Sequence, residues 1–353
     1  MVSFMPRTYP SLLSRDESSA FKGILILLVV LGHNSILMKE TNLFPYLYSF
    51  HVYCFYILPF LYGITFHDEK KGNCFYLLKR QINHYRKLGL IYLFWCLMGV
   101  LLAIFVKQIP FQPWKCIQAI LWGHQTLLKD YCGFSFLWFI PTFLAVMLWR
   151  DVYFLSTKLG KKVLFYLGVF LWCGAVAGMG GSHSLGMWCP FALIQGLFFS
   201  MAGIAVRFIL EQTRIEDGTI SKCYCLLFPI IPLYVYFRRF LPYGFNYLTW
   251  SCCPILAFLC LYSIKNYLTK CRLFLLAGKY SLQVYLLHTI VFNILLLIVK
   301  QQNIITGIIS YFATLVITAI GIWFADRFPP LRWAIFPFDL NQTKEKIQSK
   351  IEV

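Results

Sequence analysis

The chain has 353 residues, of which 59% are hydrophobic, 19% are aromatic and only 13% are charged. A soluble domain carries about 25% charged residues, so this composition excludes a soluble protein and indicates an all-α polytopic membrane protein. The formal net charge of +18 is typical of the cytoplasmic loops of membrane proteins, and no nucleic-acid-binding motif accompanies it. The thirteen cysteines lie mostly within apolar runs and show no metal-binding spacing, so we expect no metal site.

The apolar runs predict about ten transmembrane helices, since one span needs about 20 residues. In chain order, the helices are expected near residues 20–38, 44–66, 88–106, 134–156, 162–179, 188–209, 222–238, 245–264, 281–299 and 304–325.

Basic residues in the short loops predict that both termini are on the inside. They are concentrated in residues 67–87, 150–162 and 265–279, whereas residues 179–188 carry no charge. Arg238 and Arg239 fall on the expected outer side, against this pattern. We therefore expect a cytoplasmic segment at 1–19, a transmembrane domain at 20–330 and a short cytoplasmic tail at 331–353.

The longest stretch between spans, residues 107–133, is expected on the outer side. Its middle, Cys116–Leu128, is predicted as a helix lying in the membrane interface. The stretch contains Trp114, Trp122 and Tyr131. Such aromatic residues commonly form an interfacial belt, and they can also stack on sugar rings.

The first span pairs a lysine at its start with a histidine deep inside it. Lys22 and His33 are eleven residues apart, which places them on one face of a helix and about 16 Å apart along its axis. An ionisable group at that depth is costly unless it faces a protein interior or a wet cavity. His33 is therefore our candidate for proton transfer, although Lys22 alone would fit a lysine that extends to the membrane surface.

Two further histidines lie within expected spans, at His51 and His288. All three histidines would meet near the middle of the membrane if the first, second and ninth helices were neighbours. A histidine in a membrane helix is more commonly a hydrogen-bonded packing residue, so this meeting is a hypothesis. Acidic residues in the spans are few, and we expect Asp151 to pair with Arg150 and Asp326 with Arg327.

Residues 22–33, KGILILLVVLGH, consist of a basic residue, ten others and a histidine. This pattern resembles the opening motif of the membrane acyltransferase 3 family. Residues 49–63, 136–144, 276–288 and 324–330 resemble later family segments in the same order. In the second segment Val52 and Tyr53 replace the usual Met-Pro, and residues 61–63 depart from Ser-Gly-Tyr.

The resemblance implies a ten-helix O-acyltransferase in the cell membrane that moves an acyl group, most often acetyl, from cytoplasmic acetyl-CoA. The acceptor would be a hydroxyl of an envelope glycan or a lipid-linked sugar. Acyl-CoA would be a donor substrate, and no permanently bound cofactor is expected. The resemblance implies that His33 is essential and that Lys22 is the basic partner, which we expect to bind CoA phosphate. We assign acceptor binding to Ser49, His51, Tyr285 and His288.

A transporter or flippase for a lipid-linked glycan is the alternative, because many spans with internal prolines and histidines would also suit it. No internal repeat is visible in the sequence, which disfavours this alternative. The sequence does not decide the acceptor, the acyl chain or the oligomeric state.

Overall fold

A computed structural model describes residues 7–41, 54–66, 73–105, 108, 110–178, 191–214, 226, 229–230, 233, 236, 254–299, 301–328, 330 and 332. These residues belong to two compact units, which are described separately. Unit 1 contains residues Met1–Glu69, Thr157–Gly181 and Phe198–Ile322, and unit 2 contains Lys70–Ser156, Ser182–Leu197 and Trp323–Val353.

The helices of unit 1 are α1 (Arg15–Gly32), α2 (Ser35–Thr41), a helix over residues 54–61, α9 (Lys158–Gly178), Pro254–Ser263, α14 (Lys265–Leu268), α15 (Arg272–Lys279) and α16 (Ser281–Ile298), with parts of α10 (Phe191–Arg214) and α17 (Ile304–Arg327). The helices of unit 2 are α4 (Asn73–His84), a π-helical turn at Tyr85–Gly89, α5 (Leu90–Phe105), α6 (Pro113–Trp122), α7 (Gln125–Cys132), a 3₁₀ turn at Ser135–Trp138 and α8 (Phe139–Leu155), with the remaining parts of α10 and α17.

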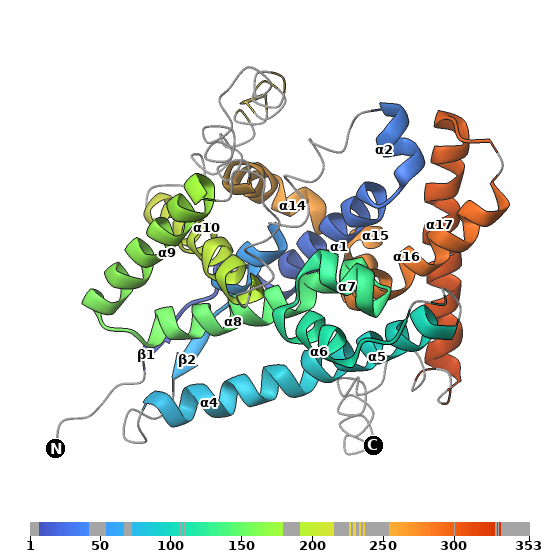
Figure 1. Cartoon of the computed structure of the whole chain (residues 1–353). Helices are drawn as coiled ribbons and strands as arrows, with labels where there is room; N and C mark the ends of the chain where they lie inside the picture. The colour runs from blue at the N-terminus through green and yellow to red at the C-terminus, as the bar shows by residue number, and fades with distance from the viewer. Residues whose placement is uncertain are drawn as a thin grey trace, which may run out of the picture. The chain divides into compact units, whose positions relative to one another are not determined.

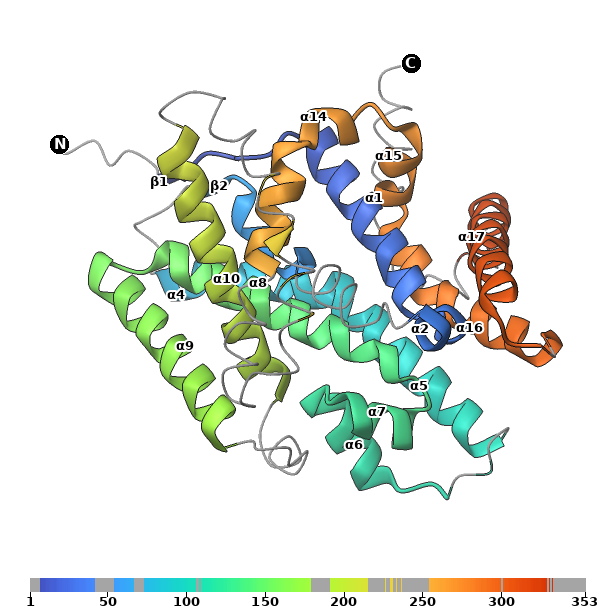
Figure 2. The same ribbon diagram turned by 90° about the horizontal axis from the view of Figure 1, so that it is seen from above.

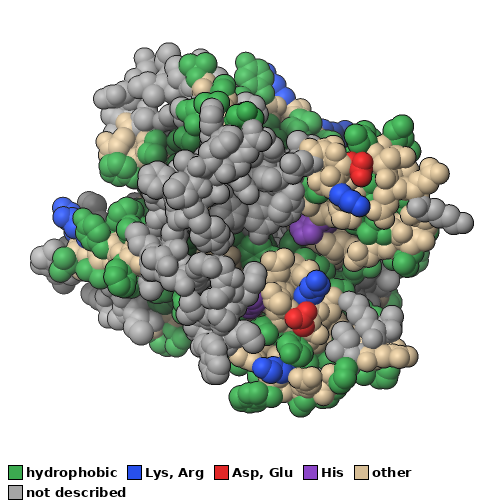
Figure 3. Space-filling model, turned by 45° about the horizontal axis from the view of Figure 1, so that its top comes forward, with side chains coloured by type: hydrophobic (Ala, Val, Ile, Leu, Met, Phe, Trp, Pro, Cys, Tyr) green, Lys and Arg blue, Asp and Glu red, His purple; other side chains and the backbone are tan. Residues whose placement is uncertain are grey.

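The prediction of a helical membrane protein is confirmed. Five described helices are long and apolar enough to cross a membrane, and the bent pair α1 and α2 would make a sixth. The five are Leu77–Phe105, Ser135–Leu155, Ala192–Gln212, Ser281–Ile298 and Ile304–Arg327. On the face of the molecule in Figure 3, hydrophobic side chains of the described residues reach the surface widely and charged ones are few, as lipid contact requires.

The other expected spans have mixed outcomes. α9 covers most of the expected helix at 162–179, and Pro254–Ser263 covers part of that at 245–264. The expected helix at 222–238 lies largely outside the described residues. The total of ten therefore stays a prediction, as does the position of both termini on the inside.

The expected helix at 44–66 is wrong at its end. Helix stops at Leu61, and β2 (Ile64–Phe66) pairs antiparallel with β1 (Arg7–Tyr9) instead. The buried Arg207 of α10 fixes this junction, since its guanidinium donates to the carbonyl oxygens of Phe60 (2.7 Å) and Pro10 (3.1 Å). The segment around β1 is thus held within unit 1 by main-chain contacts that apolar patterning does not reveal.

α1 begins five residues before the expected span because a capping box starts it. Ser14 Oγ accepts from the Glu17 N–H at 3.2 Å, and Glu17 Oε2 accepts from the Ser14 N–H at 2.7 Å. Figures 1 and 2 show α1 beside α15 and α16. Two glycines permit the crossing with α15: a Cβ on Gly23 would overlap the carbonyl oxygen of Phe274, and one on Gly278 would overlap that of Ser19.

In unit 2, the predicted interfacial helix Cys116–Leu128 is two helices, α6 and α7, which pack on each other and on α5 (Figure 1). The single helix is wrong because the chain turns at Gly123, which has a left-handed φ of 62°. α6 therefore ends at Trp122, and α7 begins at Gln125.

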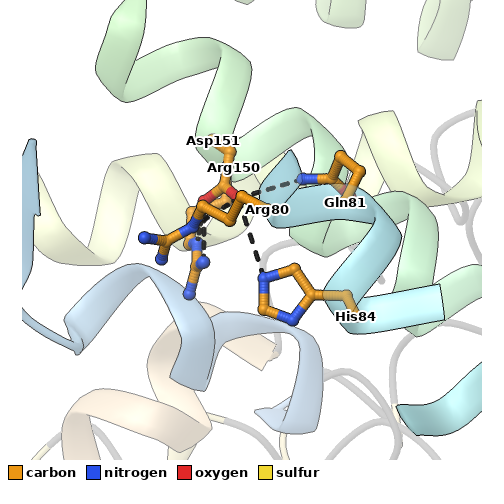
Figure 4. A network of polar contacts seen from close by, with 5 residues as sticks. All are labelled: Arg80, Gln81, His84, Arg150 and Asp151. Carbon is orange, nitrogen blue, oxygen red and sulfur yellow. Dashed lines mark hydrogen bonds and ion pairs between the residues drawn. The ribbon is translucent and has the colours of Figure 1, made fainter. Parts of the chain in front are cut away.

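A cluster of polar side chains joins α4 to α8 in unit 2 (Figure 4). The fully buried Asp151 accepts from Arg80 Nε at 2.8 Å, from Gln81 Nε2 at 2.9 Å and from Arg150 Nη2 at 2.7 Å. His84 Nε2 lies 3.8 Å from the same carboxylate. The predicted pairing of Asp151 with Arg150 is confirmed, as part of a larger cluster.

The predicted pairing of Asp326 with Arg327 is wrong. Arg327 instead stacks its guanidinium over the Trp323 ring, 4.2 Å from the centroid. Adjacent residues on a helix pair only when their side chains bend toward each other, as those of Arg150 and Asp151 do, whereas the Arg327 guanidinium is held over Trp323. Asp326 forms no ion pair with any residue that the structure describes.

Candidate active site

The candidate active site lies in unit 1, where the first membrane helix breaks. α1 ends at Gly32 and α2 begins at Ser35, and the two axes differ by 76°. The His33 N–H still donates to the Val29 carbonyl at 3.1 Å, so the helical path from Lys22 to His33 is continuous. The two residues therefore share a face of α1, about 16 Å apart along its axis. His33 occupies the corner at which the chain turns.

Asn34 holds this corner against α17. Its buried amide donates to the Gly307 carbonyl at 2.8 Å and to Ser310 Oγ at 3.1 Å. Its Oδ1 accepts from the Leu37 N–H at 3.1 Å, which caps the first turn of α2. One side chain thus caps the start of α2 and attaches the corner to α17.

His33 and His288 face each other at this corner. Their ring centroids are 4.9 Å apart, and the ring planes are inclined by 75°. Nδ1 of His33 lies 2.9 Å from the Val29 carbonyl, and Nδ1 of His288 lies 2.9 Å from the Val284 carbonyl. A carbonyl oxygen only accepts, so Nδ1 carries the hydrogen in both rings. Nε2 is then the nitrogen of each ring that gains or loses a proton.

The α16 segment contributes a second aromatic side chain. The Tyr285 ring lies 6.2 Å from that of His288, and both residues are buried. The neighbouring Thr289 Oγ1 is buried and has no hydrogen-bond partner among the described residues. The corner of α1 therefore faces a polar and aromatic surface of α16.

Lys22 lies three turns before His33 and is partly buried. No described residue forms an ion pair or a hydrogen bond with it. A partly buried ammonium without a carboxylate partner is well suited to bind an anion. The close crossing at Gly23 holds this part of α1 against α15.

The structure thus brings His33, His288 and Tyr285 together and places Lys22 on the same helix as His33. Ser49 and His51 lie outside the described residues. Sequence reasoning missed Asn34, although an asparagine that follows the last turn of one helix and precedes another is a typical N-cap. In the described part of the chain, no group of three or more metal-ligating side chains could hold a metal ion.

The fold and this site define a helical membrane protein with two facing imidazoles at a helix break. A family model described as an acyltransferase domain, that of the acyltransferase 3 family, matches residues 16–327. The chain therefore belongs to that family and is a membrane acyltransferase, with an acyl donor and an acceptor as its substrates. A comparison with curated proteins and another with solved structures found no match.

Proposed function

We propose that the protein is an O-acyltransferase of the cell membrane that uses cytoplasmic acetyl-CoA. The acceptor in this proposal is a hydroxyl of an envelope glycan or of a lipid-linked sugar. The observation that supports it most is the position of His33, whose Nδ1 is held by the backbone at a membrane helix break in a chain of an acyltransferase family.

The donor binds first in this scheme, with a CoA phosphate on Lys22. The ammonium has no described carboxylate partner that would compete for it. About 16 Å of helix separates it from His33, and the flexible pantetheine arm spans this distance to bring the thioester to the imidazole.

His33 then acts as the general base through Nε2. It takes the proton of the acceptor hydroxyl, and the oxygen attacks the thioester carbonyl carbon. The C–S bond breaks as the new ester forms, and the imidazolium returns its proton to the sulfur to give free CoA. The hydrogen bond from Nδ1 to Val29 orients the ring and leaves Nε2 as the basic atom. His288 and Tyr285 orient the acceptor.

In a covalent route, Nε2 of His33 attacks the thioester carbonyl carbon, and the C–S bond breaks to release the CoA thiolate. The acceptor oxygen then attacks the acyl-imidazole, the C–N bond breaks as the ester forms, and the hydroxyl proton goes to the thiolate to give free CoA. In this route label stays on the protein when acetyl-CoA is supplied without acceptor, whereas the general-base route leaves the protein unlabelled.

The experiment is the transfer of radiolabelled acetyl from acetyl-CoA in membranes that contain the chain, with membranes lacking it as the control. We expect label in a glycan or lipid-linked sugar fraction together with release of free CoA. Lys22→Gln should raise KM for acetyl-CoA more than it lowers kcat. Absence of labelling above control with every acyl-CoA supplied would contradict the proposal.

A further inference from the structure

α4 is amphipathic in the opposite sense to a helix of a soluble protein. Its polar side chains Arg80, Gln81 and His84 face α8 and converge on the buried Asp151 (Figure 4). The opposite face carries exposed apolar side chains. These are Phe75 (64% exposed), Leu78 (55%), Ile82 (55%) and Tyr85 (46%). Water would disfavour such a face, whereas lipid would stabilise it.

Three exposed cations lie on this segment: Lys79 on α4, and Arg86 and Lys87 in the π-helical turn that follows it. None of the three forms an ion pair with a residue that the structure describes. On a helical projection, Lys79 and Arg86 lie about 40° and 20° from Phe75, next to the apolar stripe, whereas Lys87 lies about 120° away, at the edge of the polar face. Arg80, on the other face, is paired with Asp151. Lys79, Arg86 and Lys87 are therefore the cations of this segment that can bind an external anion.

The length of the helix gives the depth of these cations. Leu77–Phe105 is 29 residues long, or about 44 Å, which matches a hydrocarbon core together with its headgroup regions. The α5 part carries no charged residue, so it occupies the core. α4 then lies at the depth of the headgroups, with its apolar stripe toward the acyl chains.

We propose that α4 and the π-helical turn after it carry a binding surface for anionic phospholipid headgroups. The surface is formed by Lys79 and Arg86 beside the apolar stripe of Phe75, Leu78, Ile82 and Tyr85, with the exposed Lys87 next to Arg86. An anionic headgroup supplies the missing counter-charge, and its acyl chains cover the exposed apolar side chains. A neutral lipid can cover the exposed apolar side chains but supplies no counter-charge. The surface would therefore select lipids by charge.

The test uses the full-length protein, reconstituted in bilayers of phosphatidylcholine and phosphatidylglycerol and then extracted in mild detergent. The ratio of the two lipids that remain bound is measured by native mass spectrometry. We compare wild type with Lys79→Gln/Arg86→Gln/Lys87→Gln. The matched control, Lys129→Gln/Lys158→Gln/Lys162→Gln, removes three exposed cations from other helices.

The α4 variant should lower the bound ratio of phosphatidylglycerol to phosphatidylcholine by about fivefold or more, because each cation near an anionic surface is worth about that factor. The control should keep the wild-type ratio, and so should the charge-conserving Lys79→Arg/Arg86→Lys/Lys87→Arg. An equal loss in both neutral variants would overturn the proposal in favour of overall charge. An unchanged ratio with a raised KM for the acyl donor would assign the cations to the donor and overturn it as well.

Discussion

Asn34 is the residue on which the position of His33 most depends. Asn34→Ala removes two donated hydrogen bonds to α17 and the cap of α2. We expect a loss of about 2 kcal/mol in stability, since a cap is worth about 1 kcal/mol and a hydrogen bond between membrane helices about 0.6. Transfer activity should fall as well, because the corner that carries His33 loses its attachment.

Two further variants separate the contribution of the α2 cap from that of the hydrogen bonds to α17. Asn34→Asp keeps the acceptor that caps α2 and loses the donors to Gly307 and Ser310, and Ser310→Ala removes one side-chain partner alone. Thermal unfolding in detergent should rank stability as wild type, Ser310→Ala, then Asn34→Ala. If Asn34→Ala unfolded at the wild-type temperature, the corner would not depend on this side chain.

At the residue scale, spacing identified Lys22 and His33, since both lie within one helix and 3.6-residue geometry relates them. The contact of His33 with His288 required the first and ninth expected helices to be neighbours, which the sequence does not encode locally. The partner of Asn34 is 273 residues away, so no local pattern reveals it.

At the scale of the helices, the crossing of α1 and α15 depends on glycine. Gly23→Ala would drive a methyl group into the Phe274 backbone, and overpacking of this kind costs about 1–3 kcal/mol. The variant should unfold at lower temperature and bind acyl donor less tightly, because Lys22 is the adjacent residue.

Gly321→Ala on α17 is the matched control. The nearest atom to its added methyl group is Leu287 Cδ1 at 3.9 Å, which is an ordinary contact. Alanine also favours helix by up to about 1 kcal/mol over glycine. Gly321→Ala should therefore be as stable as wild type or more so, and equal losses in the two variants would refute the steric explanation.

The attachment of α4 to α8 depends on Asp151. Asp151→Asn leaves Arg150 buried without its counter-charge, and breaking a buried pair in this way costs about 3–5 kcal/mol. The exposed Asp130→Asn should change stability by less than about 0.5 kcal/mol. Chemical denaturation of the purified variants measures both, and similar stabilities would show that the cluster does not hold the two helices.

Hydropathy located most described helices and failed where polar contacts decide the path. The sequence around His33 contains no proline, so the 76° bend was not expected, and the cap from Asn34 accounts for it. The turn at Gly123 is a similar case, because a single left-handed residue divides a continuous amphipathic pattern. The ion pair of Asp151 was predicted correctly and that of Asp326 wrongly. The sequence gives the spacing of two charged residues but not the directions of their side chains.

For the whole molecule, the predicted orientation gives a direct test. With basic loops on the cytoplasmic side, reporters fused to either terminus should both be active in the cytoplasm. A periplasmic or extracellular location of one terminus would require an odd number of spans and would contradict the prediction. Composition established the membrane class, whereas the packing of β1 against β2 depends on pairing across 55 or more residues and had no sequence signal.

The most direct measurement is acetyl transfer by purified, reconstituted wild type and His33→Ala at equal abundance and with equal thermal unfolding. The account predicts that wild type releases free CoA in step with ester formation and that His33→Ala loses at least about 100-fold in rate, the low end for a proton-transfer group. Full activity in His33→Ala would contradict the central claim that this imidazole performs the transfer.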